Sequence, residues 1–411
     1  MKNIVVVGAG VIGLMCAYEL RKYNEHVALI DKGDPGKACS WGNAGWIVPS
    51  LSAPLPAPGL TITALKWMMR RDSPFYIDPK ALPHMTGWLW NFWRHCDEKS
   101  NTKGKEALRS FNRFTMPLYD SLEADGIDCE MERAGLLFLF LTESAMYKHL
   151  EEIVSPDDVS PPNPLSGEEL RRIEPAVSKQ VVAGFFVKGE RHLRPESLNT
   201  GLLNWLLREQ VKVYTKTCVM GGDRQGRILK AVHTTYGSIT GDQFVIAAGA
   251  WSGLVAEKLG FRIPIQAGKG YSITISHPHS QLHIPLYLGE TRVGCTPFKH
   301  SLRLAGTLEL SGINSRVSDE RLAALAVAST KYLNFPPRVE AQSGWMGMRP
   351  LTPDGLPVIG HAPGFDNVFV ATGHGMLGMT LAAATGTAIR ELICCGHTRF
   401  ELGAFDPARF G

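Results

Sequence analysis

Three glycines near the start of the chain have the type and spacing of a turn that binds a dinucleotide. They are Gly8, Gly10 and Gly13, and they directly follow an apolar run. The first permits a tight turn, the second lets the backbone approach a pyrophosphate, and the third lets the next helix pack close to the strand. The N–H groups that begin this helix attract the phosphates. Asp31 follows 18 residues after Gly13, where an acid accepts hydrogen bonds from ribose hydroxyls and disfavours NADP.

Two further glycine-rich turns lie far along the chain, and together with the first they favour FAD over NAD. Residues 244–251 are predicted as a buried strand that runs into a turn at Gly249. Near the C-terminus, a strand ends at Gly373 and Gly375, and a helix is predicted from about Met376. A nicotinamide site does not need three such turns spread over the whole chain, whereas a long FAD molecule in an elongated slot does.

Small residues also follow the second predicted strand, within residues 38–50. Ser40, Gly42, Asn43, Ala44 and Gly45 would let this segment lie flat against a planar ring system. The same composition also fits an ordinary glycine-rich connecting loop, so both interpretations remain open from the residues alone.

The elements that must position these residues begin with a βαβ unit. It consists of a strand at 3–7, the helix after Gly13 and a second strand at 26–31. Farther along, one helix is predicted over about 104–122, and residues 261–310 are β-rich. This order of elements predicts an α/β fold, α+β overall.

Composition and charge exclude several classes of protein. The 411 residues carry a formal net charge of +4, which is too small to indicate binding of nucleic acid. The 8 cysteines are scattered and form no C-x-x-C pair, so we expect no disulfide scaffold, no metal site and a reducing compartment. No apolar run reaches the roughly 18 to 20 residues of a membrane span, and a cytoplasmic protein is expected.

The segment 60–95 is rich in tryptophan and in basic residues. Its aromatic rings would ordinarily form a packed layer or a subunit contact, but the same composition fits a helix that lies on a membrane surface. The residues concerned are Trp67, Trp88, Trp90, Trp93, Lys66, Arg70, Arg71 and Arg94.

Several longer motifs identify the chain as a member of a known superfamily. They are VVVGAGVIG, CSWGNAGWIVPS, VIAAGAW, GMRPLTPDGLPVIG and ATGHGMLGMTLA. With them the chain resembles the D-amino-acid oxidase superfamily of FAD-dependent amine dehydrogenases and oxidases over nearly its full length. Within it, the chain is most similar to the bacterial D-amino-acid dehydrogenase small subunit, through SWGNAGWIVPS, PGLTITALKWMMRRDSPF, GKGYSIT and TPFKHSLRLAGTLELSG.

The resemblance implies two domains, each interrupted by the other. A Rossmann-like FAD-binding domain would comprise residues 1–50, 193–255 and 341–411. A substrate domain with a large antiparallel sheet would comprise residues 51–192 and 256–340.

The resemblance also implies which residues contact the cofactor. Backbone at Val219 would meet the adenine, and 373–378 would present N–H groups to the flavin, where a helix N-terminus stabilises the reduced ring. The implied set is Gly8, Gly10, Val11, Ile12, Gly13, Asp31, Lys32, Ser40, Asn43, Ala44, Gly45, Trp46, Ile47, Val219, Ala248, Gly249, Trp251, Gly347, Gly373, His374, Gly375, Met376, Leu377, Gly378, Met379 and Thr380.

Three residues are implied in substrate binding. Arg349 would hold an α-carboxylate with two parallel hydrogen bonds; the alternative is a surface or interdomain arginine. Tyr271 would add a hydroxyl or shield the site. His374 would position the ring through its backbone or take part in acid–base chemistry.

One departure from related sequences bears on how the cofactor is held. In sarcosine-oxidase relatives, a cysteine two residues before the arginine carries the flavin covalently. Gly347 stands at that position here, so FAD is expected to bind non-covalently.

The activity implied is FAD-dependent oxidative deamination of a D-amino acid. Hydride would pass from Cα to flavin N5, and the imino acid would hydrolyse to a 2-oxo acid. Electrons would pass to a quinone, with peripheral contact of 60–95 with the inner face of the cell membrane. The alternatives are a glycine/sarcosine-type or proline/hydroxyproline amine oxidase that uses oxygen, an NAD-dependent dehydrogenase, and a non-catalytic flavin-binding subunit. The sequence does not determine the oligomeric state.

Overall fold

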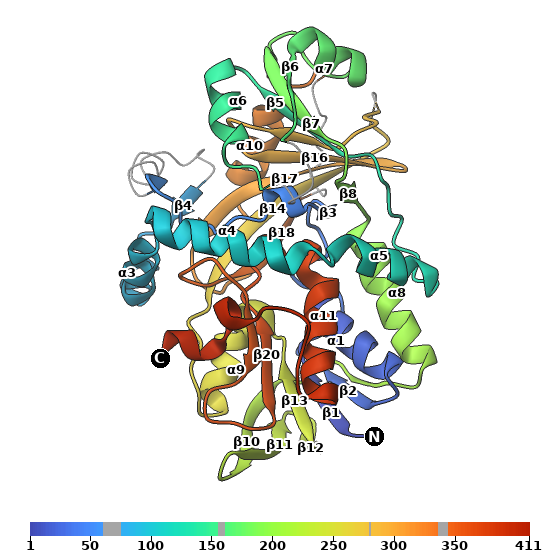
Figure 1. Cartoon of the computed structure of the whole chain (residues 1–411), viewed down its shortest axis with the longest axis vertical. Coiled ribbons are helices and arrows are strands. Elements are labelled where there is room, and N and C mark those ends of the chain that lie inside the picture. The colour runs from blue at the N-terminus through green and yellow to red at the C-terminus, as the bar shows by residue number, and fades with distance from the viewer. Residues whose placement is uncertain (61–74, 155–160, 279–280, 336–343) are drawn as a thin grey trace.

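The computed structural model describes residues 1–60, 75–154, 161–278, 281–335 and 344–411. Two sheets dominate it: one with mainly parallel strands in the lower half of Figure 1, and a larger, mainly antiparallel sheet in the upper half. The expected fold class, α/β and α+β overall, is confirmed.

The lower sheet has the strand order β19-β20-β13-β1-β2-β9 in the described part of the chain. All neighbouring strands are parallel except β19 and β20. Apolar residues dominate β1 because parallel strands are covered on both faces. The bounds are β1 Asn3–Val7, β2 His26–Ile30, β9 Lys212–Tyr214, β13 Gln243–Ile246, β19 Val358–His361 and β20 Val368–Thr372.

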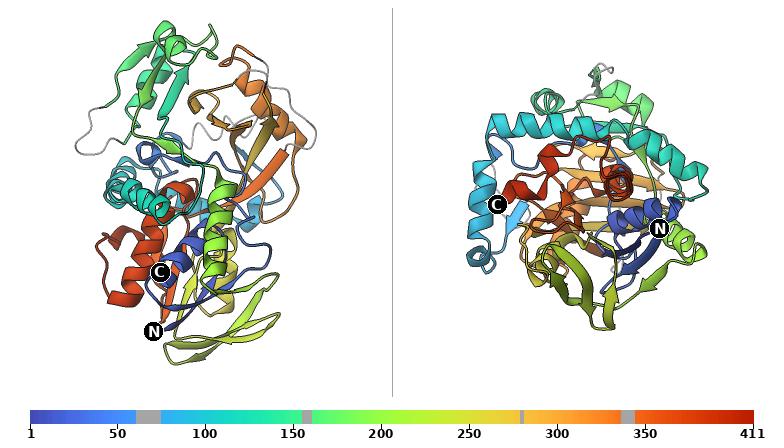
Figure 2. Two further views of the ribbon diagram at one scale, coloured as in Figure 1. Left: turned by 90° about the vertical axis from the view of Figure 1, so that its right-hand side faces the viewer. Right: turned by 60° about the horizontal axis from the view of Figure 1, so that its bottom comes forward.

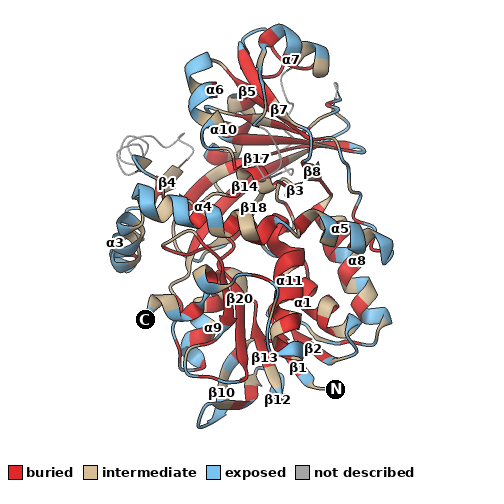
Figure 3. Cartoon of the chain, viewed as in Figure 1, coloured by how far each residue is buried: buried red, intermediate tan, exposed pale blue. Residues whose placement is uncertain are grey.

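Helices cover one face of this sheet, and a small sheet and a short helix cover the other. Helices α1 (Val11–Lys22) and α11 (Gly378–Cys395) pack against each other and against the first face, where both are largely buried (Figure 3). The second face packs against a three-stranded antiparallel sheet and α9, with bounds β10 Val219–Gln225, β11 Ile228–Thr234, β12 Gly237–Thr240 and α9 Ser252–Lys258.

The upper sheet has the order β18-β14-β17-β16-β15-β5-β7-β6, and β4 pairs with β17 at its side. Its pairings are antiparallel except β15 with β5 and β17 with β4. The bounds are β4 Phe75–Ile77, β5 Leu136–Phe140, β6 Pro164–Ser166, β7 Ala183–Val187, β14 Gln266–Ser276, β15 Leu286–Leu288, β16 Val293–Phe298, β17 Ser301–Leu310 and β18 Gly344–Leu351.

The remaining elements link or flank the two sheets, as the two views of Figure 2 show. A two-stranded ribbon joins the loop that follows β2 to the segment that precedes α8. The bounds are β3 Trp46–Ile47, β8 Arg191–His192, α3 Thr86–Arg94, α4 Glu98–Asn112, α5 Thr115–Ala124, α6 Glu143–Leu150, α7 Gly167–Ile173, α8 Pro195–Arg208 and α10 Asp319–Ser329.

The single helix expected over 104–122 is wrong, because α4 ends at Asn112 and α5 begins at Thr115. Pro117 lies in the first turn of α5 and has no N–H with which to bond the carbonyl of Arg113, so a continuous helix is disfavoured. Both helices pack on α11 beside the lower sheet, although the range 51–192, which contains them, was expected to belong to the substrate domain.

Strand β18 pairs with β14 along its whole length, from Gly344 opposite Ile273 to Leu351 opposite Gln266. It therefore belongs to the upper sheet, whereas the range 341–411 assigns it to the cofactor domain. The two-domain division by sequence range remains a prediction, and its boundaries do not coincide with those of the sheets.

Two compositional expectations concern the chain as a whole. All 8 cysteines are free thiols. Among the described residues, no group of three or more His, Cys, Asp or Glu side chains is placed to hold a metal ion, and no helix is both long and apolar enough to cross a bilayer.

Candidate active site

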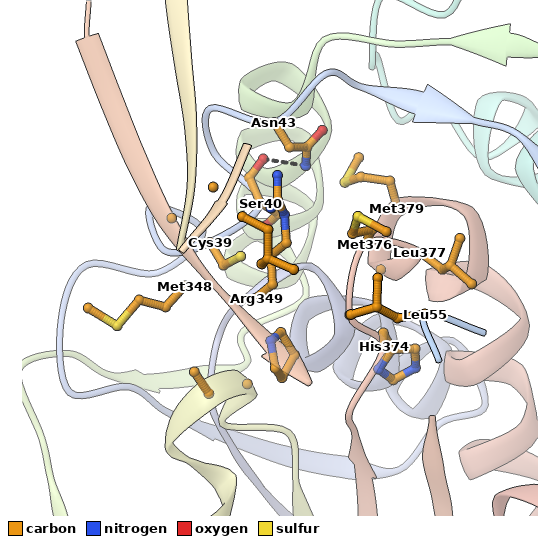
Figure 4. A pocket seen from close by; sticks show the side chains of 18 of the residues that line it. Cys39, Ser40, Asn43, Leu55, Met348, Arg349, His374, Met376, Leu377 and Met379 are labelled. Atoms are coloured by element: carbon orange, nitrogen blue, oxygen red, sulfur yellow. Dashed lines mark hydrogen bonds between the residues drawn. The ribbon is translucent and has the colours of Figure 1, made fainter. Parts of the chain in front are cut away.

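A cavity of about 1500 Å³ is lined by residues from both halves of the molecule. Its wall is built from the β1–α1 turn, the loop after β2, the start of β10, the segment after β13, strands of the upper sheet and the β20–α11 junction. Figure 4 shows side chains from three of these segments around the same space, with Cys39 in the loop, Arg349 in β18 and His374 at the junction, while Met348 points to the other side of β18. Segments that are hundreds of residues apart therefore meet at one site.

The β1–α1 turn shows why each glycine is needed. A Cβ at Gly8 would lie 2.3 Å from the carbonyl oxygen of Ala247, and one at Gly13 would lie 1.8 Å from the carbonyl oxygen of Gly8. A Cβ at Gly10 would meet no protein atom within 4 Å, and Gly10 lines the cavity. Gly8 and Gly13 thus close-pack the turn, and Gly10 leaves space on the cavity side for a bound group.

Asp31 and Lys32 lie at the same end of the cavity. Asp31 accepts hydrogen bonds from the N–H groups of Ala9 and Gly33, both at 2.7 Å, so the acid fixes the turn that precedes α1. The ammonium of Lys32 lies 3.3 Å from the ring centroid of Trp251. Burial lowers the pKa of Lys32.

The loop after β2 is anchored to the upper sheet and, through that sheet, to helix α8. The Asn43 amide donates to the carbonyl of Ser40 at 2.7 Å (Figure 4). The buried guanidinium of Arg303 donates to the carbonyl of Asn43 at 3.0 Å and forms an ion pair with Glu196 of α8. The indole of Trp46 donates to Thr296 at 2.8 Å. These contacts set the loop as a rigid wall of the cavity.

The β20–α11 junction presents backbone to the cavity. Gly373 and Gly375 have φ of +75° and +54°, a region that favours glycine. Nε2 of His374 lies 2.9 Å from Oγ1 of Thr385, and its Nδ1 is buried without a hydrogen-bond partner. Burial lowers the pKa of His374 to about 3, so this imidazole is neutral at physiological pH.

Arg349 brings a cation from β18 of the upper sheet to the cavity. Its Nη1 donates to the carbonyl of Thr307 at 2.6 Å, and among the described residues no carboxylate lies within 4.0 Å of the guanidinium. Burial raises the pKa of the neighbouring Cys39 thiol to about 11, so Cys39 does not supply a counter-charge. Burial lowers the pKa of Arg349, but an arginine stays protonated in proteins.

Tyr271 lies on the other face of the sheet from Arg349. The register pairs Gly268 with Arg349 and Tyr271 with Met346, and successive side chains of a strand point to opposite faces. The Tyr271 hydroxyl donates to Glu309 at 2.9 Å. The residue contributes to the cavity wall, but its hydroxyl proton is donated to Glu309 and is not free to bind a substrate carboxylate.

Most of the predicted cofactor and substrate residues line the one cavity. Those that do not are close-packed behind its wall: Gly13, Gly45, Ile47, Gly373 and Thr380. Those that do are Gly8, Gly10, Val11, Ile12, Asp31, Lys32, Ser40, Asn43, Ala44, Trp46, Val219, Ala248, Gly249, Trp251, Tyr271, Gly347, Arg349, His374, Gly375, Met376, Leu377, Gly378 and Met379.

Trp345 is a lining residue that the sequence reasoning missed. A Cβ at Gly42 would lie 2.4 Å from its ring, and one at Gly347 would lie 2.1 Å from it, so the indole fills the space between loop and strand. The period of two along β18 places residues 345, 347 and 349 on one face. That alternation was the signal that could have found it.

The comparisons with known proteins agree with a site for a dinucleotide in a redox enzyme. The family model described as FAD dependent oxidoreductase matches residues 3–392. The chain therefore belongs to this family, and its cofactor is FAD. The cavity fits such a group, because it has a volume of about 1500 Å³, Gly10 leaves space on its wall, and the lining residue His374 has a buried Nδ1 without a hydrogen-bond partner.

Solved structures share the fold over almost the whole chain. Glycine oxidase from Geobacillus kaustophilus is 22% identical with a TM-score of 0.77, and the match covers 99% of this chain and 98% of that one. L-proline dehydrogenase from P. horikoshii is 21% identical with a TM-score of 0.77, and the match covers 100% and 97%. L-alpha-glycerophosphate oxidase from Mycoplasma pneumoniae, with FAD bound, is 17% identical with a TM-score of 0.70, and the match covers 95% and 94%. These likenesses concern the fold, which evidently serves donors of different chemistry.

Proposed function

We propose that the protein oxidises the carbon–nitrogen bond of an amino acid, a D-amino acid by preference, and passes the electrons to a quinone. The observation that carries the proposal is the guanidinium of Arg349, which reaches the FAD cavity without a carboxylate partner among the described residues. A charge held out of water without a counter-charge is costly. A substrate carboxylate would supply that counter-charge.

Each residue at the site has a limited task in this proposal. The glycine turns and the loop after β2 would hold FAD, which accepts two electrons as a hydride when it is bound. Arg349 would fix the carboxylate with the N–H groups that Thr307 does not use. His374, being neutral, would hold its ring in place rather than carry a proton. Catalysis would then come mainly from positioning and electrostatics.

An apolar part of the cavity supports the choice of a quinone. It adjoins Thr307 and is lined by Leu55, Phe75, Ile77, Leu89, Phe92, Trp93 and Leu308. Such a wall would suit an apolar ring better than a polar acceptor. Preference for the D-isomer rests on the sequence motifs.

Anaerobic mixing of the yellow holoenzyme with D-, L- and N-substituted amino acids tests the proposal. D-amino acids should bleach the flavin fastest, and a water-soluble quinone should restore the colour faster than oxygen. Peroxide formed from glycine, sarcosine or proline at full rate would indicate the amine-oxidase alternative instead.

Arg349→Ala should weaken amino-acid binding on the order of 10²-fold, because two charge-assisted hydrogen bonds are lost. Arg349→Lys keeps the positive charge but loses the planar guanidinium, so its affinity for the amino acid should lie between those of the wild type and Arg349→Ala. Unchanged turnover of every amino acid by Arg349→Ala would remove the basis of the proposal.

A further inference from the structure

The guanidinium of Arg349 occupies the space above a glycine of the neighbouring strand. Strands β18, β14 and β17 are adjacent in that order, and Arg349 of β18 is paired with Gly268 of β14. A Cβ at Gly270 would lie 2.2 Å from Nη2, 2.3 Å from Cζ and 2.8 Å from Nη1 of Arg349. No real Cβ contact is that short, so any side chain at position 270 would displace the guanidinium.

The next strand is irregular at the same point. Lys269 is opposite Glu309, but Tyr271 is opposite Gly306. Two residues of β17, Thr307 and Leu308, thus face the single Gly270, which defines a β-bulge. Bulges commonly lie beside active sites, where they redirect a group.

The bulge brings its own backbone carbonyl to the guanidinium. Thr307 has φ of +57°, which is strained for a β-branched residue. Its carbonyl accepts the hydrogen bond from Nη1 of Arg349 at 2.6 Å. The side chain of Arg349 therefore starts on β18, crosses over Gly270 and ends at the bulge of β17.

We propose that Gly270 and the bulge at Thr307 are positioning elements that aim Arg349 and thereby determine selectivity for a carboxylate. Gly270 leaves the path open, and the Thr307 carbonyl fixes one nitrogen so that the others face the cavity. The inference rests on the proposed function of Arg349 and adds the residues that set its geometry.

The test is Gly270→Ala, with Gly268→Ala as the matched control two residues earlier in the same strand. The three atoms nearest to a Cβ at Gly268 would lie 2.6 to 3.2 Å away in the flexible side chains of Leu351 and Leu308, and none of the three belongs to Arg349. The readout is the dissociation constant of propionate, a carboxylate that cannot be oxidised as an amine, measured from the change in the flavin spectrum of the holoenzyme. Gly270→Ala should weaken propionate binding by at least about tenfold. Gly268→Ala should not, and FAD affinity should stay the same in both.

A double-mutant cycle separates this inference from the proposed function. In the Arg349→Ala background, Gly270→Ala should add nothing, because the group that it displaces is gone. If Arg349→Ala binds propionate normally, the carboxylate role of Arg349 is wrong. If Arg349→Ala loses binding and Gly270→Ala keeps it, only the positioning inference is wrong.

Two further variants keep the inference testable if Gly270→Ala does not fold. The variant that combines Gly270→Ala with Arg349→Ala has room for the new Cβ and should fold. If this double variant also failed to fold, the strand itself would need Gly270, and the inference would be overturned. Thr307→Gly keeps the carbonyl and adopts a positive φ without strain, so it should bind propionate like the wild type. A loss of binding there would contradict the role of the carbonyl.

Discussion

Glu190 is a buried carboxyl group whose protonation should govern stability near neutral pH. It is 4% exposed, and Oε1 accepts a hydrogen bond from the N–H of Ser50 at 3.0 Å, while Oε2 has no partner. Burial raises its pKa from 4.5 to about 7. Between these values the folded protein holds a proton that the unfolded chain has released, so stability falls as the pH rises from 4.5 to 7.

Glu190→Gln mimics the neutral acid at every pH and should remove this dependence. At pH 8 the variant should be more stable than the wild type by about 3 kcal/mol, whereas at pH 4 the two should be alike. Urea unfolding at both pH values measures the difference. Glu168→Gln, at an exposed pair with Arg172, is the control and should change stability by less than about 0.5 kcal/mol. An equal pH slope in Glu190→Gln and wild type would contradict the assignment.

Helix α3 is the element that bears on contact with a membrane. Its two sides differ: the indole of Trp88 donates to the carbonyl of Pro264 and stacks on Phe92, while Trp90 and Trp93 are 59% and 51% exposed. Two adjacent exposed indoles are typical of a membrane interface. The basic residues Lys66, Arg70 and Arg71 and Trp67, which belong to the same expectation, lie outside the described residues.

We expect the holoenzyme to bind vesicles of mixed neutral and anionic phospholipid through these rings. Trp90→Ser combined with Trp93→Ser should reduce the bound fraction severalfold in a sedimentation assay, because the exposed apolar area of α3 is lost. Tyr236→Ser removes a ring that is 75% exposed on the far small sheet and should have no effect. Equal binding by the double variant and the wild type would exclude α3 as the contact.

Across the whole molecule, local features were predictable and long-range pairings were not. The β1–α1 turn follows from Gly8, Gly10 and Gly13 because their spacing is a local property. Tyr271 and Arg349 lie on opposite faces of the upper sheet because of the register between β14 and β18. These strands are some 80 residues apart in the chain, and no local sequence pattern specifies which of their residues pair. The break between α4 and α5 could have been predicted from Pro117. The helical spacing of apolar residues on both sides of the break favoured a single helix instead.

A largely buried ion pair joins strand β17 of the upper sheet to helix α8, and the molecule's cofactor affinity should depend on it. Arg303 of β17 is 3% exposed and binds Glu196 of α8, Thr274 of β14 and the carbonyl of Asn43 in the cofactor loop. Glu196→Gln would leave a buried guanidinium without its counter-charge, which costs about 3 kcal/mol or more. Because the same guanidinium anchors Asn43, the loop should loosen and FAD affinity should fall together with stability.

Denaturant unfolding of the apoprotein and fluorescence titration with FAD measure these two effects separately. The matched control is Asp366→Asn, which breaks the pair with Arg227 whose side chains are 52% and 62% exposed. An exposed pair contributes less than about 1 kcal/mol, and this one lies away from the cavity wall, so FAD affinity should stay unchanged. If Glu196→Gln lowered stability and left FAD affinity intact, the pair would join β17 to α8 without shaping the cofactor site. If it matched Asp366→Asn in both measurements, the pair would have no role in either, and the loop would be held by its other bonds to the upper sheet, such as that between Trp46 and Thr296.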